Sequence, residues 1–173
     1  MLNRRVTLRD EVPEDKAFLY RLYASTREAE MNMVPWPQEQ KDEFLKMQFE
    51  LQTAHYRQHF ADASFQIIFC DGDDAGRLCV HRTRHEIRVV DIALLPEFRN
   101  AGIATKLLNE LADEGGITGR KITMHVLRES PALRLYQRLG FTVTEDKGVY
   151  LFVEWNPSAV PKNAVGEEVS ANL

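Results

Sequence analysis

The sequence predicts an α+β fold with a mixed, mostly antiparallel central sheet of about seven strands, flanked by about four helices. Two observations lead to this prediction. Apolar residues recur at helical spacing in some segments and alternate with polar residues in others. The order of these segments is strand, two helices, three strands, helix, strand, helix and two strands, which is typical of an α+β domain.

The N-terminal part of the chain predicts one strand and two helices. Residues 6–9 alternate and form the first strand. Pro13 begins a helix, with acidic residues in its first turn and apolar residues at helical spacing up to about Glu30. The segment Pro35-Trp36-Pro37 ends this helix, since the residue before a proline is driven out of helical geometry. A second helix is expected over residues 38–60.

A hairpin and a third strand follow. The pattern predicts strands at residues 65–70 and 76–83, joined by a turn at 71–75, and a strand at residues 86–95 that Pro96 closes. Beyond it we expect a helix, a strand, a second helix ended by a glycine, and a last hairpin. These elements are predicted at residues 102–113, 121–127, 131–139, 141–145 and 149–155, with Gly140 after the second helix.

Length and composition indicate one domain. The chain has 173 residues, the usual size of a domain with a single core. Residues 1–155 are expected to form this domain. Residues 156–173 are expected to be a flexible tail, because they contain prolines, a glycine and few large apolar side chains.

The charge and the apolar pattern exclude several classes of partner. The net charge is −4, from 26 acidic against 22 basic residues, whereas a nucleic-acid-binding protein concentrates positive charge. Arg82, Arg84 and Arg88 alternate along a strand and are expected at a solvated edge. The sequence shows no signal peptide and no apolar run of about 20 residues, so we expect a cytoplasmic protein with no membrane partner. In that compartment Cys70 and Cys79 are expected to be free thiols.

The most informative segment leads from the strand before Pro96 into the next helix. A short loop follows the proline, and the helix begins at the small residues Ala101-Gly102-Ile103-Ala104. Small side chains let a ligand approach the backbone, and the unpaired N–H groups of a first helical turn suit a phosphate. Arg99 adds a positive charge that could pair with an anion. A glycine before a helix can also mark only a turn, so both interpretations stay open.

Two motifs in this region resemble those of a known family. Arg99-x-x-Gly102-x-Ala104 resembles the acetyl-CoA signature, Arg/Gln-x-x-Gly-x-Gly/Ala, of the GCN5-related N-acetyltransferases (the GNAT family), and the segment 94–98 resembles its lead-in. The segment from Ser130 to Phe141 resembles the second signature, Asn-Pro-Ala-x-x-Leu-Tyr-x-x-x-Gly-Phe. The two motifs occur in the family's order and at its usual separation, so the resemblance covers roughly residues 65–155.

The resemblance implies how acetyl-CoA, the expected co-substrate, is held. Backbone groups of Ile92, Ala93 and Leu94 would pair with the pantetheine arm like an added strand. Ser130 stands where the family usually has an asparagine that contacts the cofactor. Amides of the loop and of the first helical turn would hold the pyrophosphate, namely those of Asn100, Ala101, Gly102, Ile103, Ala104 and Thr105.

N-acylation needs a base that takes a proton from the amine, and the departing thiolate gains from an acid. Tyr136 matches the tyrosine that in many relatives protonates or hydrogen-bonds the coenzyme A sulfur. Two residues are open as the base. His125 carries an imidazole of suitable pKa, and Glu86 lies on the strand before the loop, in the region where histone-acetylating relatives place theirs. Many relatives use ordered water instead. Asp91 is less suited, because it adjoins the backbone that should serve pantetheine.

The N-terminal part of the chain, where the family places the helices that face the amine acceptor, carries no motif shared with the family. Glu28 and Trp36 lie in a segment between the two N-terminal helices that mixes carboxylates with an aromatic ring, and such a segment could cover an amine. Trp36 could equally be a side chain that only packs between the two helices. His55 and His59 share a helical face near Asp62, but no further ligand has convincing spacing, so no metal site is predicted.

The sequence therefore predicts an acyl-CoA N-acyltransferase that moves an acetyl group to a primary amine. Direct attack in a ternary complex is expected, since no cysteine lies at the loop. A small-molecule amine is favoured as acceptor over a protein N-terminus or a lysine side chain, and a monomer or homodimer is expected. The alternative is a non-catalytic acyl-CoA-binding sensor or interaction module on the same fold.

Overall fold

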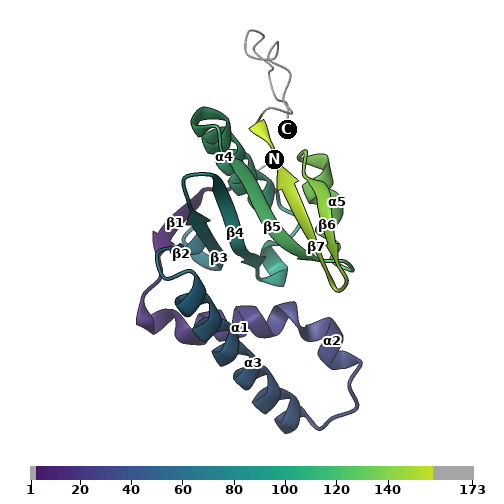
Figure 1. The fold of residues 1–173 in the computed structure, drawn as a ribbon. Helices are drawn as coiled ribbons and strands as arrows, with labels where there is room; N and C mark the ends of the chain where they lie inside the picture. Colours follow the sequence, from purple (N-terminus) through teal and green to yellow (C-terminus); the bar gives the residue numbers. More distant parts are fainter. Residues whose placement is uncertain (1–2, 158–173) are drawn as a thin grey trace. The chain divides into compact units, whose positions relative to one another are not determined.

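A computed structural model describes residues 3–157 of the chain (Figure 1). These residues fall into two compact units. The first unit contains residues 3–81 and Val89–Ile103, and the second contains Arg82–Arg88 and residues 104–157. Of the predicted tail, residues 158–173 lie outside the described residues.

Seven strands form one sheet in the order β1-β2-β3-β4-β5-β7-β6. The pairs β1–β2, β2–β3, β5–β7 and β6–β7 are antiparallel, whereas β4–β5 is parallel. The α+β class and the mostly antiparallel seven-stranded sheet are thus confirmed. The strands are β1 (Val6–Asp10), β2 (Ser64–Cys70), β3 (Asp73–Arg82), β4 (Glu86–Leu94), β5 (Lys121–Leu127), β6 (Thr142–Lys147) and β7 (Tyr150–Trp155).

The first unit contains the N-terminal helices. The short 3-10 turn η1 (Pro13–Asp15) leads into α1 (Lys16–Thr26), and α2 (Glu28–Asn32) and α3 (Gln38–His59) follow. The single first helix that the sequence predicted is divided at Arg27, whose backbone leaves helical geometry at φ −106° and ψ 1°. The hydroxyls of Ser25 and Thr26 donate to carbonyls of the preceding turn at 2.7 Å, which favours an end to α1 at this point.

Aromatic and aliphatic side chains from two helices and the sheet form the core of the first unit. Leu19 of α1, Phe49 of α3 and Ile67 of β2 are buried together, and Phe49 also packs edge-on against Tyr20 at 5.7 Å between ring centroids. Burial of side chains of this size stabilises a fold by about 1.5–3 kcal/mol each. These contacts hold α1 and α3 on the strands that they cover.

The β2–β3 hairpin has a shorter turn than the sequence indicated. The predicted turn at residues 71–75 is wrong, because β3 already begins at Asp73, which pairs with Cys70. The connection consists of Asp71 and Gly72, with φ of 54° and 93°. A two-residue hairpin turn with positive φ at both positions matches the twist of its strands. Cys70 and Cys79 are both buried, and neither forms a disulfide within the described residues.

In the second unit, α4 (Ile103–Thr118) is longer than predicted. The helix was expected to end near residue 113, but it continues through Gly115 and Gly116. A Cβ at Gly115 would lie 2.7 Å from the carbonyl oxygen of Arg120 and 3.0 Å from Cζ3 of Trp155. Gly115 is therefore needed for close packing and does not end the helix.

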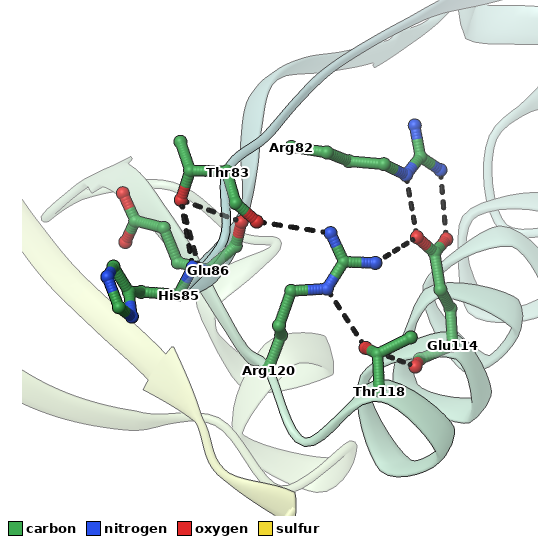
Figure 2. Close-up of polar contacts among 7 residues, drawn as sticks. All are labelled: Arg82, Thr83, His85, Glu86, Glu114, Thr118 and Arg120. Carbon is green, nitrogen blue, oxygen red and sulfur yellow. Dashed lines mark hydrogen bonds and ion pairs between the residues drawn. The ribbon is translucent and has the colours of Figure 1, made fainter.

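Charged side chains fasten the C-terminal part of α4 (Figure 2). Nε and Nη2 of Arg82 donate to the two carboxylate oxygens of Glu114 at 2.7 and 2.9 Å, and Nη2 of Arg120 donates to the same carboxylate at 3.0 Å. Arg120 also donates to the hydroxyl of Thr118 and to the carbonyl of Thr83. Arg82, expected at a solvated edge, is partly exposed and also forms this ion pair. Arg82 is the main cause of a lowered pKa at Glu114.

The last helix, α5 (Leu133–Arg138), begins two residues later than predicted. Ser130, Pro131 and Ala132 form a turn in which the Ala132 N–H donates to the Ser130 hydroxyl at 3.2 Å. Gly140, with φ 98°, follows the helix as predicted, and its N–H donates to the carbonyl of Gln137.

Candidate functional site

The loop between β4 and α4 has two residues in the left-handed region. After the 3-10 turn η2 (Pro96–Phe98), Asn100 has φ 58° and Gly102 has φ 80°. Glycine adopts this conformation without strain, and asparagine tolerates it. Asn100, Ala101 and Gly102 are exposed, and a Cβ added at Gly102 would meet nothing within 4 Å. The glycine therefore serves the backbone turn, and the space in front of it is open to a ligand.

Arg99 is held against the end of the preceding strand. Its Nε donates to the carbonyl of Leu94 at 2.9 Å, and Nη2 donates to the Ser25 hydroxyl of α1 at 3.5 Å. A cation fixed at this position places its positive charge at the start of the loop. Sequence reasoning assigned the charge to an anion, whereas the structure shows that Arg99 also orders the protein backbone.

The strand end predicted to serve pantetheine is packed tightly against β3. Ile92, Ala93 and Leu94 are half-buried, and the Leu95 N–H donates to the carbonyl of Ala75 at 2.9 Å. A Cβ on Gly76 would lie only 2.1 Å from the Ala93 carbonyl oxygen. Gly76 is therefore required for the position of this part of β4.

Glu86, the first residue of β4, is bound by its neighbours in the second unit. One carboxylate oxygen accepts a hydrogen bond from the Thr123 hydroxyl at 3.0 Å, and the other lies 3.6 Å from Nη2 of Arg88. Thr123 itself is fully buried. The Glu86 N–H and the N–H of His85 both donate to the Thr83 hydroxyl, which fixes the start of the strand (Figure 2).

His125 of β5 is an exposed residue whose ring lies 5.0 Å from that of Phe152, its partner on β7. Partial burial of the imidazole lowers the pKa of His125, and the cations of Lys147 and Arg88 lower it further. The ring is therefore biased toward its neutral form, which is the form that a general base needs.

Tyr136 and Ser130 belong to the second motif. Tyr136 is buried, with 8% of its surface exposed, and its ring lies 6.1 Å from that of Phe141. The Phe141 N–H donates to the carbonyl of Tyr136, so the Gly-Phe end of the motif fixes the end of α5. The Ser130 hydroxyl is engaged by the Ala132 N–H in the turn before the helix.

The two predicted acceptor residues lie at the surface of the first unit. Glu28 begins α2 and is exposed. Trp36 precedes α3, packs edge-on against Phe44 at 5.5 Å and keeps 38% of its surface exposed. The contact with Phe44 agrees with a packing role for Trp36, and the remaining exposure leaves one part of the indole accessible.

The sequence did not predict a small pocket of about 40 Å³ in the first unit, between α1, α3 and the sheet. Its walls include Leu22 and Phe49, and polar side chains of Arg77 and Asp91 line it beside Ala93. Burial raises the pKa of Asp91, while Arg77 opposes this shift. These residues are far apart in the chain, so no local motif could have linked them.

Within residues 3–157, no group of three or more His, Cys, Asp or Glu side chains is arranged to hold a metal ion. His59 forms a hydrogen bond with the carbonyl of His55, and Asp62 pairs with His81 at 2.8 Å. No helix in this part of the chain combines the length and apolar character needed to cross a membrane.

Comparison with known proteins supports the resemblance that the two motifs suggested. Residues 61–143 match the family model described as "Acetyltransferase (GNAT) domain". N-alpha-acetyltransferase 50 of Danio rerio is 26% identical over 149 residues, which are 84% of this chain and 80% of that protein. Cysteine-rich protein 2-binding protein of Homo sapiens is 42% identical over 50 residues, but the chain spans only 6% of its length.

The fold has relatives of known structure. The PaiA N-acetyltransferase of Thermoplasma acidophilum, solved in complex with coenzyme A, has a TM-score of 0.65 at 19% identity. The alignment covers 88% of this chain and 99% of that one. The chain therefore matches the GNAT acetyltransferase domain over residues 61–143 and shares its fold with a solved N-acetyltransferase.

Proposed function

We propose that this protein transfers an acetyl group from acetyl-CoA to a primary amine by direct attack within a ternary complex. The observation that carries the proposal is the loop from Arg99 to Gly102, which leads from a strand end into a 16-residue helix. Its exposed backbone, two left-handed residues and adjacent cation suit a diphosphate. A neighbour of the same fold has coenzyme A bound, and a relative is named an N-alpha-acetyltransferase.

Each part of the acetyl donor has a proposed partner. Amides of residues 100–105 hold the pyrophosphate, and backbone groups of residues 92–94 pair with the pantetheine arm. The Leu94 carbonyl already accepts a hydrogen bond from Arg99, so the arm depends on the remaining groups of this strand end. Ser130 is the proposed cofactor contact of the second motif: its hydroxyl oxygen accepts a hydrogen bond from the Ala132 N–H, and its O–H can still donate.

Tyr136 is the proposed acid. A phenol has a pKa near 10, so it can donate a proton to a thiolate as the carbon–sulfur bond breaks. His125 and Glu86 stay as the predicted bases. The neutral bias of His125 suits that role, whereas the Glu86 carboxylate is engaged by Thr123 and Arg88. The proposed acceptor is a small amine, with Glu28 and Trp36 at the entrance.

A thiol-release assay with purified protein tests the proposal. Acetyl-CoA is incubated with a panel of small amines, amino acids and short peptides, and free coenzyme A is measured with a thiol reagent. Acceptor-dependent release, with a product heavier by one acetyl group in mass spectrometry, is the expected result. Acetyl-CoA binding without release by any amine would replace the transferase with a non-catalytic acyl-CoA-binding module.

A further inference from the structure

The 22-residue helix α3 (Figure 1) carries apolar side chains on two opposite faces. Leu45 and Phe49 lie on the inner face and are buried, with 6% and 4% of their surface exposed. On the outer face Met47 and Leu51 keep 52% and 58% of their surface exposed. Single apolar side chains are common at a protein surface, whereas a contiguous row of them marks an interaction surface.

The outer face has the spacing of a coiled-coil seam. It is formed by residues separated by alternating steps of four and three positions, namely Gln40, Phe44, Met47, Leu51, Ala54 and Gln58. These six residues are the α3 seam. They occupy heptad positions a and d, which in a coiled coil fit between the side chains of a second helix. Leu45 and Phe49 fall at positions b and f, so the core of the first unit and the α3 seam use different side chains.

The middle of the α3 seam is apolar, and its two ends are polar. Phe44 is half-buried and packs edge-on at 5.5 Å against Trp36, which keeps 38% of its surface exposed and widens the apolar surface. Ala54, near the other end, is exposed and leaves room for a large neighbour. The row therefore has a large side chain at one end and a small one at the other.

We propose that the α3 seam is an interface between two copies of this chain, with the two α3 helices antiparallel across a two-fold axis. Position a then faces position d of the partner, so Phe44 lies opposite Ala54 and Met47 lies opposite Leu51. Large side chains facing small ones fill such a layer without overpacking. Because a two-fold interface uses the same surface on both copies, each of these contacts forms twice.

The charges along one border of the α3 seam favour this pairing. Glu43, Glu50 and Arg57 occupy position g, which in an antiparallel pair faces position g of the partner. Glu43 of each copy then lies beside Arg57 of the other. Arg57 is 53% exposed and gives one hydrogen bond to Glu11, and a guanidinium has further N–H donors for a second carboxylate. Glu50 meets its own copy, but Lys16 of the same chain lies 2.7 Å from its carboxylate and offsets the repulsion.

A parallel pair of helices fits less well. It would set Phe44 against Phe44 and Ala54 against Ala54, so one layer would be crowded and another underfilled. Position g would face position e, and Glu43 would meet the uncharged Gln48 in place of Arg57. The order of side chains in α3 is thus complementary to its own reverse, which identifies a second copy of this chain as the partner.

The first test is sedimentation equilibrium of the full chain from about 1 µM to about 200 µM. The mass of the wild type should rise from that of one chain to that of two. Leu51→Glu should raise the dissociation constant of the dimer about 100-fold or more, because each dimer would bury two carboxylates opposite Met47. Ala54→Phe should raise it about ten-fold or more, because the new ring would meet Phe44. The control Ile117→Glu changes a residue of α4 that is 86% exposed and should match the wild type.

The second test uses conservative cysteine variants and reports the direction of the helices. Met47→Cys and Leu51→Cys proteins are oxidised separately and as a mixture. The antiparallel pair predicts a cross-linked dimer mainly in the mixture, since residues 47 and 51 face each other. Cys70 and Cys79 are buried, so they should not cross-link in the wild type, which serves as the control.

Circular dichroism establishes that each variant is folded, since every substituted position of α3 is exposed. A wild type that stays monomeric over the whole concentration range overturns the proposal. A folded Leu51→Glu protein that dimerises as tightly as the wild type places the interface elsewhere and also overturns it. Cross-linking of each cysteine variant with itself, and not in the mixture, overturns the antiparallel arrangement. The readouts are mass and cross-linking, so the transferase proposal stands or falls separately.

Discussion

Substitution of Gly76 by alanine probes the strand end that should serve pantetheine. The added Cβ would lie 2.1 Å from the Ala93 carbonyl oxygen and 2.9 Å from Cδ2 of Leu94. Non-bonded heavy atoms prefer separations of about 3.5–4.0 Å, so β3 and β4 would have to separate by about 1 Å or more. Overpacking of this kind costs about 1–3 kcal/mol, and loss of the neighbouring bond from Leu95 to the carbonyl of Ala75 adds about 1 kcal/mol.

The expected loss for Gly76→Ala is therefore about 2–4 kcal/mol in the free energy of unfolding. Urea denaturation followed by circular dichroism measures it. Calorimetric titration of the folded variant should also show weaker acetyl-CoA binding, because the displaced backbone is the part of β4 proposed to pair with pantetheine. Gly116→Ala is the matched control: its Cβ meets nothing within 4 Å inside α4, and it should stabilise the protein by about 0.5–1 kcal/mol.

Two results would contradict this reasoning. Gly76→Ala could unfold within about 0.5 kcal/mol of the wild type, which would mean that the strands separate without cost. Alternatively, a clear loss of stability with unchanged acetyl-CoA affinity would show that the packing matters to the fold while the position of Ala93 does not matter to the co-substrate.

Three further predictions concern the loop, the acid and a buried ion pair. Gly102→Glu should abolish coenzyme A binding in calorimetry, because it adds bulk and negative charge beside the proposed diphosphate site and strains a residue at φ 80°. Unchanged affinity in a folded variant would show that this loop is not the diphosphate site. Tyr136→Phe should lower kcat about ten-fold or more and leave the Kd of acetyl-CoA nearly unchanged, and equal turnover would reduce Tyr136 to a packing residue. Asp15→Asn should cost about 2 kcal/mol at pH 7, because Asp15 accepts two hydrogen bonds of 2.7 Å from Arg9, which lower its pKa. A carboxyl group whose pKa is lower in the folded protein stabilises the fold at pH values above its pKa in the unfolded chain. This stabilisation is lost as the pH falls through its pKa in the folded protein. The gap between wild type and Asp15→Asn in urea titrations should therefore shrink toward pH 2, and a gap independent of pH would exclude the ionic origin.

Local patterns in the sequence were sufficient for most helices and strands. Apolar spacing placed α3 and β5 within one residue of their observed ends, and Gly140 marked the end of α5. The segment Arg99-x-x-Gly102-x-Ala104 could be recognised in the sequence because its proposed function depends on backbone conformation and on small side chains at fixed spacing. Where residues had long-range roles, the same reasoning failed: the helix expected over residues 102–113 continues through Gly115, which accommodates Trp155.

The tertiary structure alone decided which distant residues meet. Glu11, Arg77 and Asp91 come from three separate segments, and only the packing of the strands brings their charges together. Sequence reasoning set Asp91 aside because it adjoins the pantetheine strand, yet that position places it beside Ala93 in a pocket. Local propensities arise from interactions within a few residues, so they specify helices, strands and turns. The burial and electrostatics of a side chain depend instead on neighbours supplied by the whole fold, and these determine which carboxylate can act as a base.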